Sequence, residues 1–246
     1  MKKILTILLL LSFTADLSAI DHPGAVKPGI HSEDFVLIEN GKPIPIIVSF
    51  SDNQAVMHAV EDLQNDFMMV SGVKPQLCGS VTSDRAIIVG SLESEIIQNL
   101  AAKGLLDVTP LQGRNEKYLI TFVQNPMDGV SEALVIAGSD RRGTVYGIYE
   151  LSEQIGVSPW YDWADVPVAR HKDMAIARGT YTAGEPAVRY RGIFLNDEAP
   201  CLTGWVKHTY GTDYGDHRFY ERVFELLLRL RANFCESLRC NLDMFR

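Results

Sequence analysis

Between residues 34 and 154, short apolar runs alternate with amphipathic stretches, and this alternation is what most limits the folds open to the chain. The clearest amphipathic stretch is followed by Gly72, a residue that favours the end of a helix. Its apolar residues recur at spacings of three and four and so share one helix face: Val56, Val60, Leu63, Phe67 and Val70. The apolar runs around it have the length of buried strands. The pattern predicts an α/β domain in which helices cover a mixed sheet.

The remaining elements of this domain follow from the same pattern. We expect strands at residues 35–38, 44–48, 86–89, 118–123 and 133–137, and further helices at 96–100 and 143–154. Residues 157–188 contain three prolines and few periodic apolar positions, which is typical of a connection between domains. The sequence therefore predicts a small accessory α/β domain at residues 30–170 and a linker at 171–188.

The first 19 residues have the layout of a secretory signal peptide. Two lysines follow the initial methionine, an apolar run extends from Ile4 to Phe13, and the small residues Ser18 and Ala19 precede the expected cleavage point. This run is shorter than the roughly 20 residues that a membrane-spanning helix needs. We expect an exported protein, periplasmic or secreted, that is not held in a membrane.

Charge and motif content exclude several functions. The formal net charge of −8 disfavours nucleic acid and anionic membranes as partners. The six histidines form no HExxH arrangement, and the four cysteines form no CxxC pair, so no metal or other cofactor is predicted. Cys235 and Cys240 have two alternatives: a disulfide in an oxidising compartment, or unpaired thiols.

The segment Gly138–Thr144 follows a predicted strand and opens a predicted helix, as a phosphate-binding loop does. It lacks the lysine that such a loop requires, so a nucleotide site is not favoured. The structural interpretation is a tight turn in which Asp140 caps the helix. Arg141 and Arg142 are expected to be solvated, with a sugar acid as the alternative partner.

A second unit begins at Arg189. We predict a strand at residues 190–195, a loop, and a helix from about residue 216 to residue 233 with an apolar face. Together they make one βα unit, whereas a closed (β/α)8 TIM barrel takes about 250 residues. Residues 189–246 are therefore predicted as the start of a truncated barrel.

The predicted strand delivers Asn196, Asp197 and Glu198 together at its end. Substrates bind at the carboxyl ends of barrel strands, and paired carboxylates are what glycosidic bond hydrolysis needs. The alternative is a polar strand end that caps the next segment. Trp205 follows nearby and, like Trp160 and Trp163, offers a flat face for a sugar ring; the alternative for these aromatics is interdomain core.

Two stretches, residues 138–167 and 190–205, resemble the N-terminal part of glycoside hydrolase family 115, the xylan α-1,2-glucuronidases. They include the sequence Ser-Asp-Arg-Arg-Gly-Thr-Val-Tyr-Gly from Ser139 and the sequence Tyr-Arg-Gly-Ile-Phe-Leu-Asn-Asp-Glu-Ala-Pro from Tyr190. Cys201 departs from the small residue usual in the family.

The resemblance implies removal of (4-O-methyl)-glucuronic acid side chains from glucuronoxylan by an inverting, metal-independent route with two carboxylic acids. By position, Asn196, Asp197, Glu198 and Trp205 are the candidate substrate-binding residues, with Asp197 in direct contact with the substrate. The catalytic acid and base would come from later strands. The partner is the polysaccharide or its oligosaccharides, and homodimerisation is an open alternative for full-length members.

After Phe234 the sequence departs from the second, Leu-, Trp- and Pro-rich barrel strand of the family. This departure predicts a truncated gene or a frame error, and a chain that is inactive alone. One rival is a non-catalytic carbohydrate-binding or accessory domain. Another is an unstable product that exposes the apolar face of its last helix.

Overall fold

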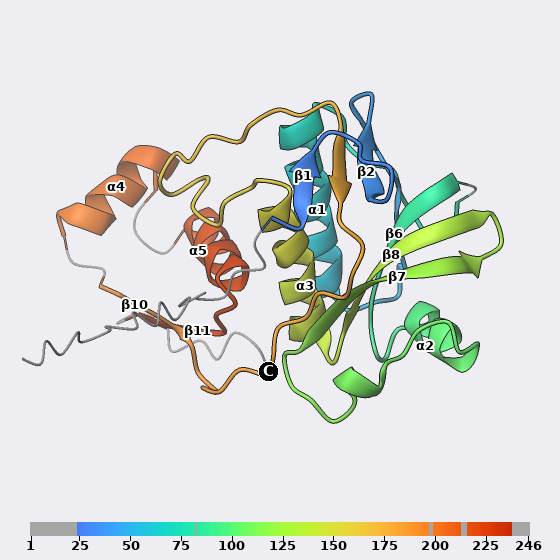
Figure 1. The fold of residues 1–246 in the computed structure, drawn as a ribbon. Coiled ribbons are helices and arrows are strands. Elements are labelled where there is room, and N and C mark those ends of the chain that lie inside the picture. The colour runs from blue at the N-terminus through green and yellow to red at the C-terminus, as the bar shows by residue number, and fades with distance from the viewer. Residues whose placement is uncertain (1–23, 82, 197–198, 213–215, 238–246) are drawn as a thin grey trace, which may run out of the picture.

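The computed structural model describes residues 24–81, 83–196, 199–212 and 216–237 as two α/β units in contact (Figure 1). The larger unit contains nine of the strands and three of the helices, and the smaller unit begins at strand β10 (Gly192–Leu195). The strands of the larger unit are β1 (Val26–Pro28), β2 (Phe35–Glu39), β3 (Lys42–Pro43), β4 (Ile46–Val48), β5 (Leu77–Cys78), β6 (Ser83–Ser91), β7 (Tyr118–Met127), β8 (Val130–Gly138) and β9 (Met174–Ile176).

The centre of the larger unit is a five-stranded sheet of order β5-β4-β6-β8-β7. β4, β5, β6 and β8 run parallel, and β7 is antiparallel at one edge. Neighbouring residues in one strand pack into different clusters because strand side chains alternate between faces. Ile46 and Ile87 join the cluster with helices α1 (Gln54–Ser71) and α3 (Arg141–Gln154). Ile47 and Ile88 join the cluster with α2 (Glu95–Ala102) on the other face.

These elements confirm the α/β class, with helices and strands where the periodicity predicted them. Helix α1 carries its predicted apolar stripe fully buried, and Gly72 ends it in the left-handed conformation with φ +85°. The predicted strands correspond to β2, β4, β6, β7 and β8. The 3₁₀ turn Thr109–Leu111 lies between α2 and β7.

The expected linker differs from the structure. Within residues 171–188, Met174–Ile176 forms β9, which lies between β1 and β2 in a four-stranded antiparallel sheet of order β1-β9-β2-β3. All three residues of β9 are buried. Part of the predicted linker is therefore bonded into the larger unit.

The smaller unit contains two parallel strands, β10 and β11 (Phe234–Ser237), joined through helices α4 (Cys201–Tyr210) and α5 (His217–Arg229). Asp216 caps α5 by accepting a hydrogen bond from the Arg218 N–H. Helix α4 lies in a region predicted as a loop, and β11 lies where the sequence departs from the family pattern. The described residues thus form a βαβ arrangement rather than a single βα unit. A closed barrel remains a prediction.

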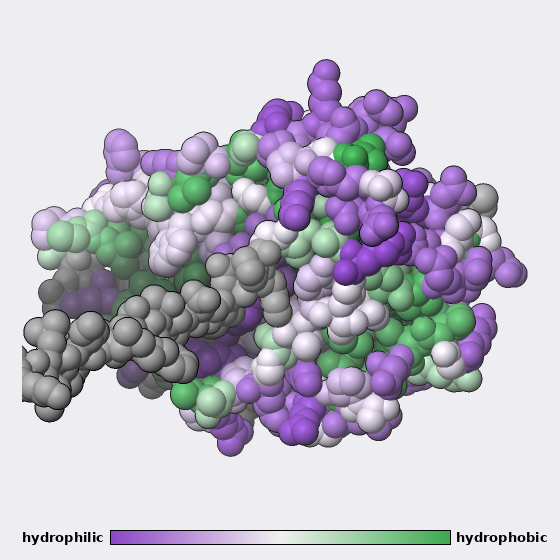
Figure 2. All heavy atoms as spheres, in the orientation of Figure 1, coloured by the Kyte–Doolittle hydropathy of each residue, from purple (hydrophilic) through white to green (hydrophobic). Residues whose placement is uncertain are grey.

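Helix α3 lies between the five-stranded sheet and α5, so it belongs to the contact between the units (Figure 1). In the same orientation, the visible face is largely hydrophilic, with hydrophobic residues in separate patches (Figure 2). Among the described helices, none combines the length and the apolar character of a membrane span.

Candidate functional site

The candidate substrate-binding edge is the carboxyl end of β10, where the sequence predicted it. Gly192 pairs with Phe234 and Leu195 pairs with Ser237, so β10 and β11 end at the same edge. Asn196 follows β10 directly and is exposed. Asp197 and Glu198, the two predicted carboxylates, lie outside the described residues. Their role remains a prediction.

A glycine permits this pairing of the two strands. A Cβ atom on Gly192 would lie 1.8 Å from the carbonyl oxygen of Phe234, closer than any side chain allows. The strand register therefore depends on Gly192, and this register brings the ends of β10 and β11 together.

Trp205, the fourth predicted residue, lies on α4 in an aromatic cluster. Its ring centroid lies 5.6 Å from that of Trp163 and 6.3 Å from that of Phe219 on α5. The Trp163 indole N–H donates to the carbonyl of Arg222 at 3.3 Å, and this hydrogen bond holds the chain around Trp163 against α5. This packing is the interdomain alternative that the sequence left open for Trp163. Trp205 keeps 43% of its surface exposed, and its role in sugar stacking stays a prediction.

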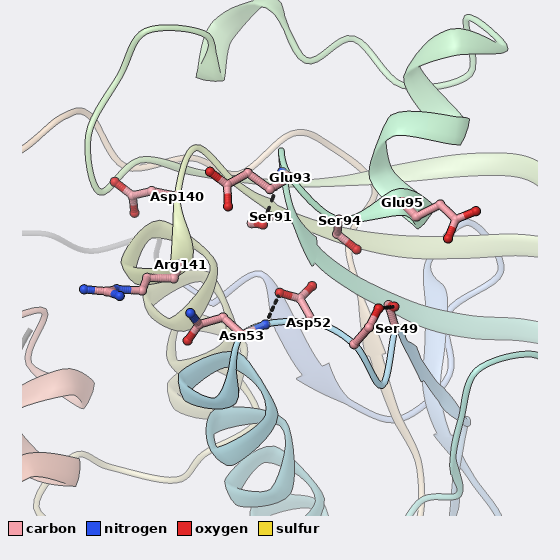
Figure 3. A pocket seen from close by; sticks show the side chains of 10 residues that line it. Ser49, Asp52, Asn53, Ser91, Glu93, Ser94, Glu95, Asp140 and Arg141 are labelled. Atoms are coloured by element: carbon pink, nitrogen blue, oxygen red, sulfur yellow. Dashed lines mark hydrogen bonds between the residues drawn. The ribbon is translucent and has the colours of Figure 1, made fainter. Parts of the chain in front are cut away.

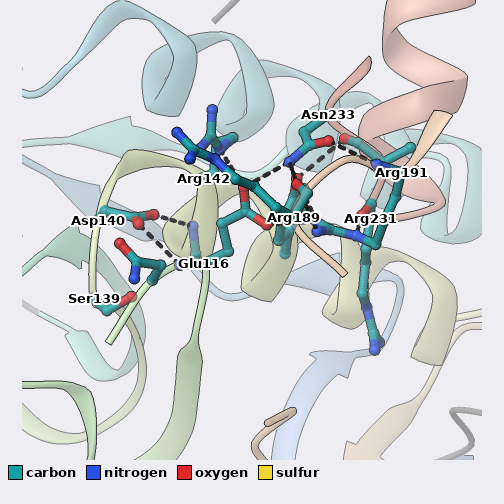
Figure 4. A network of polar contacts seen from close by, with 12 residues as sticks. Glu116, Ser139, Asp140, Arg142, Arg189, Arg191, Arg231 and Asn233 are labelled. Carbon is teal, nitrogen blue, oxygen red and sulfur yellow. Dashed lines mark hydrogen bonds and ion pairs between the residues drawn. The ribbon is translucent and has the colours of Figure 1, made fainter. Parts of the chain in front are cut away.

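A polar network around Glu116 joins the larger unit to the starts of β10 and β11 (Figure 4). Glu116 is 6% exposed, and its carboxylate accepts from Arg191 at 2.5 Å and from the Asn233 amide at 2.9 Å. It also forms an ion pair with Arg142 at 2.7 Å. Two cations and an amide thus compensate one buried carboxylate, as a buried charge requires.

The position of this network separates the two ends of the small sheet. Arg191 immediately precedes β10, and Asn233 immediately precedes β11. Asn196 lies beyond the other end of β10, five residues after Arg191, which at about 3.3 Å per residue is roughly 17 Å away. The larger unit therefore holds the amino ends of the strands and leaves the carboxyl edge to other contacts.

A second network is buried between α1, α3 and α5. The guanidinium of Arg229 donates to both carboxylate oxygens of Asp66, at 3.0 and 2.9 Å, and both side chains are almost completely buried. The guanidinium also lies over the rings of Tyr149 and Tyr161, 4.7 and 5.1 Å from their centroids. Burial opposes the charged form of Arg229, but the Asp66 carboxylate outweighs it and keeps the pKa of Arg229 above its usual value.

Asp62 lies beside this network. Burial is the main cause that raises the pKa of Asp62 to about 6, and nearby Glu225 contributes to the rise; the Tyr149 hydroxyl, which donates to the carboxylate at 2.6 Å, opposes it. The carboxyl group is thus close to half protonated near pH 6. It belongs to the contact between the units, not to the β10 edge.

The Gly138–Thr144 segment is the capped turn that the sequence favoured. The Asp140 carboxylate accepts from the N–H of Gly143 at 2.8 Å and from the N–H of Glu116 at 2.9 Å, so it caps α3 and fixes the neighbouring chain. The expectation of a solvated Arg142 was wrong, because Arg142 is paired with buried Glu116. Sequence reasoning could not find this pair, since nothing local marks Glu116 as its partner.

The expectation of no metal and the pairing of the cysteines stay predictions. Within the four described ranges, no group of three or more His, Cys, Asp or Glu side chains could hold a metal ion. The alternatives for Cys235 and Cys240 stay open because Cys240 lies outside those ranges.

The larger unit has helices on both faces of its five-stranded sheet, and it is followed by two parallel strands that are joined through helices. The model of glycosyl hydrolase family 115 matches residues 183–246. A solved family 115 4-O-methyl-α-glucuronidase with specificity for decorated arabinogalactans is 34% identical, with a TM-score of 0.71 over 83% of this chain and 26% of that chain. The chain belongs to glycoside hydrolase family 115.

Weaker likenesses also exist. A mutant Streptomyces plicatus β-hexosaminidase in complex with GlcNAc is 15% identical, with a TM-score of 0.47 over 87% of this chain and 33% of that chain. A Vibrio harveyi exo-β-N-acetylglucosaminidase is 16% identical, with a TM-score of 0.45 over 87% of this chain and 24% of that chain. Among curated protein sequences, none matches. The chain spans about a quarter of the length of the family 115 structure.

Proposed function

We propose that this chain is the N-terminal part of an α-glucuronidase that removes (4-O-methyl)-glucuronic acid side chains from a plant polysaccharide. The single observation that carries the proposal is membership of family 115, supported by 34% identity to a 4-O-methyl-α-glucuronidase. An acidic chain with an expected signal peptide at residues 1–19 fits a periplasmic or secreted enzyme that acts on an extracellular polymer.

In this proposal the carboxyl edge of β10 binds the sugar to be released. Asn196 donates from its amide to a ring hydroxyl or to the uronic acid, Asp197 contacts the substrate directly, and Glu198 completes the edge. Inverting hydrolysis needs one carboxylic acid to protonate the leaving oxygen and one carboxylate to activate water, about 6.5–9.5 Å apart. We assign these two roles to residues of a complete barrel outside residues 24–237.

Residues 24–237 by themselves are proposed to bind without hydrolysing. Two parallel strands with the helices between them form one wall of a site, whereas the reaction needs carboxylates on both sides of the sugar. The rival function, a non-catalytic carbohydrate-binding domain, gives the same result for this segment. The two differ once a complete barrel is present, because only the enzyme then releases uronic acid.

The polysaccharide has two candidates. The sequence resemblance favours glucuronoxylan. The specificity of the 34%-identical relative for decorated arabinogalactans favours the second. Both carry the uronic acid as a side chain, so the edge at Asn196 has the same chemical task in either case.

The test is release of 4-O-methylglucuronic acid from glucuronoxylan and from a decorated arabinogalactan by the protein with a complete family 115 barrel. We expect release from one of the two polymers. Asp197→Ala should lower kcat/KM on the order of 100-fold, since a polar contact made in the transition state is lost. Ser131→Ala, on an exposed position of β8, is the matched control and should leave the rate unchanged. Binding of either polymer without any release would favour the non-catalytic rival.

A further inference from the structure

A polar pocket of about 630 Å³ opens at the carboxyl end of the parallel strands in the larger unit (Figure 3). Its walls are three loops that lead into helices: residues 49–53 before α1, 91–95 before α2, and 140–141 at the start of α3. The volume lies in the range of about 300–1,000 Å³ that is usual for small-molecule sites.

The sheet topology explains why a pocket forms at this edge. Helix α1 packs on one face of the sheet and α2 packs on the other, so the loops after the neighbouring strands β4 and β6 leave in opposite directions. Ligands of open α/β sheets bind in the crevice that such diverging loops create.

Two buried oxygen atoms in this pocket have no hydrogen-bond partner. The Ser94 hydroxyl belongs to a residue that is 6% exposed, and it makes no hydrogen bond. One Asp52 carboxylate oxygen accepts from the N–H of Asn53 at 2.7 Å, while the other is buried without a partner. The two residues come from different loops and lie on opposite sides of the pocket (Figure 3). Buried polar atoms are rarely left unpaired, so these two point to a missing ligand.

The chemistry of the two atoms selects the ligand. The Ser94 hydroxyl can donate, and the Asp52 carboxylate can only accept. Hydroxyl groups on a ligand satisfy both atoms, since a hydroxyl can accept from Ser94 and can donate to Asp52. Two further serines, Ser49 and Ser91, line the same pocket and add the same kind of contact.

Charge excludes the other common ligands of such a crevice. Four carboxylates line the pocket, and Arg141 is the one cationic residue among those that line it, so a phosphate or a uronic acid would be repelled. A metal ion is disfavoured because the described residues contain no cluster of three or more metal-ligating side chains. What remains is a neutral molecule with several hydroxyl groups.

We infer that this pocket binds a neutral sugar residue, at a site separate from the β10 edge. Asp140 lines the pocket and accepts from the N–H of Glu116, whose carboxylate holds the residues before β10 and β11. The pocket therefore lies on the side of the amino ends of these strands, away from Asn196. It would hold an uncharged sugar of a glycan while the β10 edge faces elsewhere.

The experiment is saturation-transfer NMR on the full chain with methyl β-xylopyranoside and methyl β-galactopyranoside, and with glucuronate and inorganic phosphate as charged probes. We expect at least one neutral glycoside to bind in a way that depends on Ser94, and neither anion to do so; glucuronate held at the β10 edge would respond to Asn196→Ala instead. Ser94→Ala should weaken binding about threefold to tenfold, because one neutral hydrogen bond is lost, and Asp52→Asn should weaken it by about tenfold or more, because a charge-assisted hydrogen bond is lost. Because the Ser94 hydroxyl has no partner, Ser94→Ala should leave the unfolding temperature unchanged.

Two further variants separate this pocket from the rest of the surface. Ser131→Ala makes the same change outside the pocket, and Asn196→Ala alters the β10 edge; both should bind the glycoside like the unaltered protein. The inference is overturned if no neutral glycoside binds, if Ser94→Ala weakens the binding of an anion rather than of a glycoside, or if Asn196→Ala weakens glycoside binding while Ser94→Ala does not. None of these outcomes depends on hydrolysis, so failure here is distinct from failure of the proposed function.

Discussion

At the scale of single residues, Asp62 makes the stability of the protein depend on pH. Its pKa is raised from 3.8 to about 6 in the folded state, chiefly by burial, so the folded protein holds this proton more tightly than the unfolded chain. This proton therefore stabilises the folded state fully below about pH 4, and its contribution to the free energy of unfolding is lost as the pH rises through about 6. The loss is about 2–3 kcal/mol.

Asp62→Asn should remove this loss. The amide oxygen can still accept from the Tyr149 hydroxyl, which now donates to the carboxylate at 2.6 Å, and it carries no charge to bury. We expect the free energy of unfolding to rise by about 2 kcal/mol at pH 7 and to change little at pH 4. Urea denaturation at pH 7 and at pH 4 measures the two free energies of unfolding. Glu61→Gln, on an exposed neighbour in α1, should have no such pH dependence; equal effects of the two variants would contradict the assignment.

At the scale of elements, α3 approaches the sheet closely because it carries glycine where it meets β7. A Cβ atom on Gly143 would lie 2.2 Å from the carbonyl oxygen of Lys117, a backbone atom that cannot move aside. Gly143→Ala should therefore lower the free energy of unfolding by about 2–3 kcal/mol, as overpacking does. A Cβ atom on Gly204, within α4, would meet nothing within 4 Å.

Gly204→Ala in α4 is therefore the matched control, and it should change the free energy of unfolding in the opposite direction. Gly204→Ala should raise the free energy of unfolding by up to about 1 kcal/mol, because alanine is the better helix former. Denaturant titrations of both variants decide the matter. Destabilisation by both, or by neither, would show that helix packing does not distinguish the two positions.

Elements were predictable from the sequence where they carry their own local signal. Helix α1 has a buried apolar stripe and a terminating glycine, and α3 begins after the capping residue Asp140. Strand β9 has three residues and exists through pairing with strands about 140 residues away, which no local pattern reveals. Helix α4 begins after Pro200 with no side-chain cap, so its start has no sequence signal.

The candidate site also has parts that could be predicted from the sequence and parts that could not. The polar end of β10 could be predicted because an apolar run stops at Asn196. No sequence pattern indicated the Glu116 network or the pocket at Ser94. Glu116 and Asn233 are 117 residues apart, and the pocket exists through the way three loops diverge from one sheet. Such sites depend on long-range contacts that only the folded chain brings together.

At the scale of the whole molecule, the smaller unit should depend on the larger unit for its stability. Two buried ionic networks cross their contact, one centred on Glu116 and one on Arg229, and α3 packs against α5 between them. The described part of the small unit has two four-residue strands, too few for independent stability. Its stability in this chain must therefore come largely from the larger unit.

Asp66→Ala tests this dependence, because it leaves the guanidinium of Arg229 buried without its main partner. We expect a loss of about 3–5 kcal/mol, with amide hydrogen exchange accelerated in α5 and β11 more than in β6 and β8. Replacing the pair together, as Asp66→Leu with Arg229→Met, should recover most of the loss, since no unpaired charge is then buried. If Asp66→Ala instead accelerated exchange equally in β6 and α5, the two units would share a single unfolding event. If exchange in α5 stayed unchanged, the small unit would be stable without this contact.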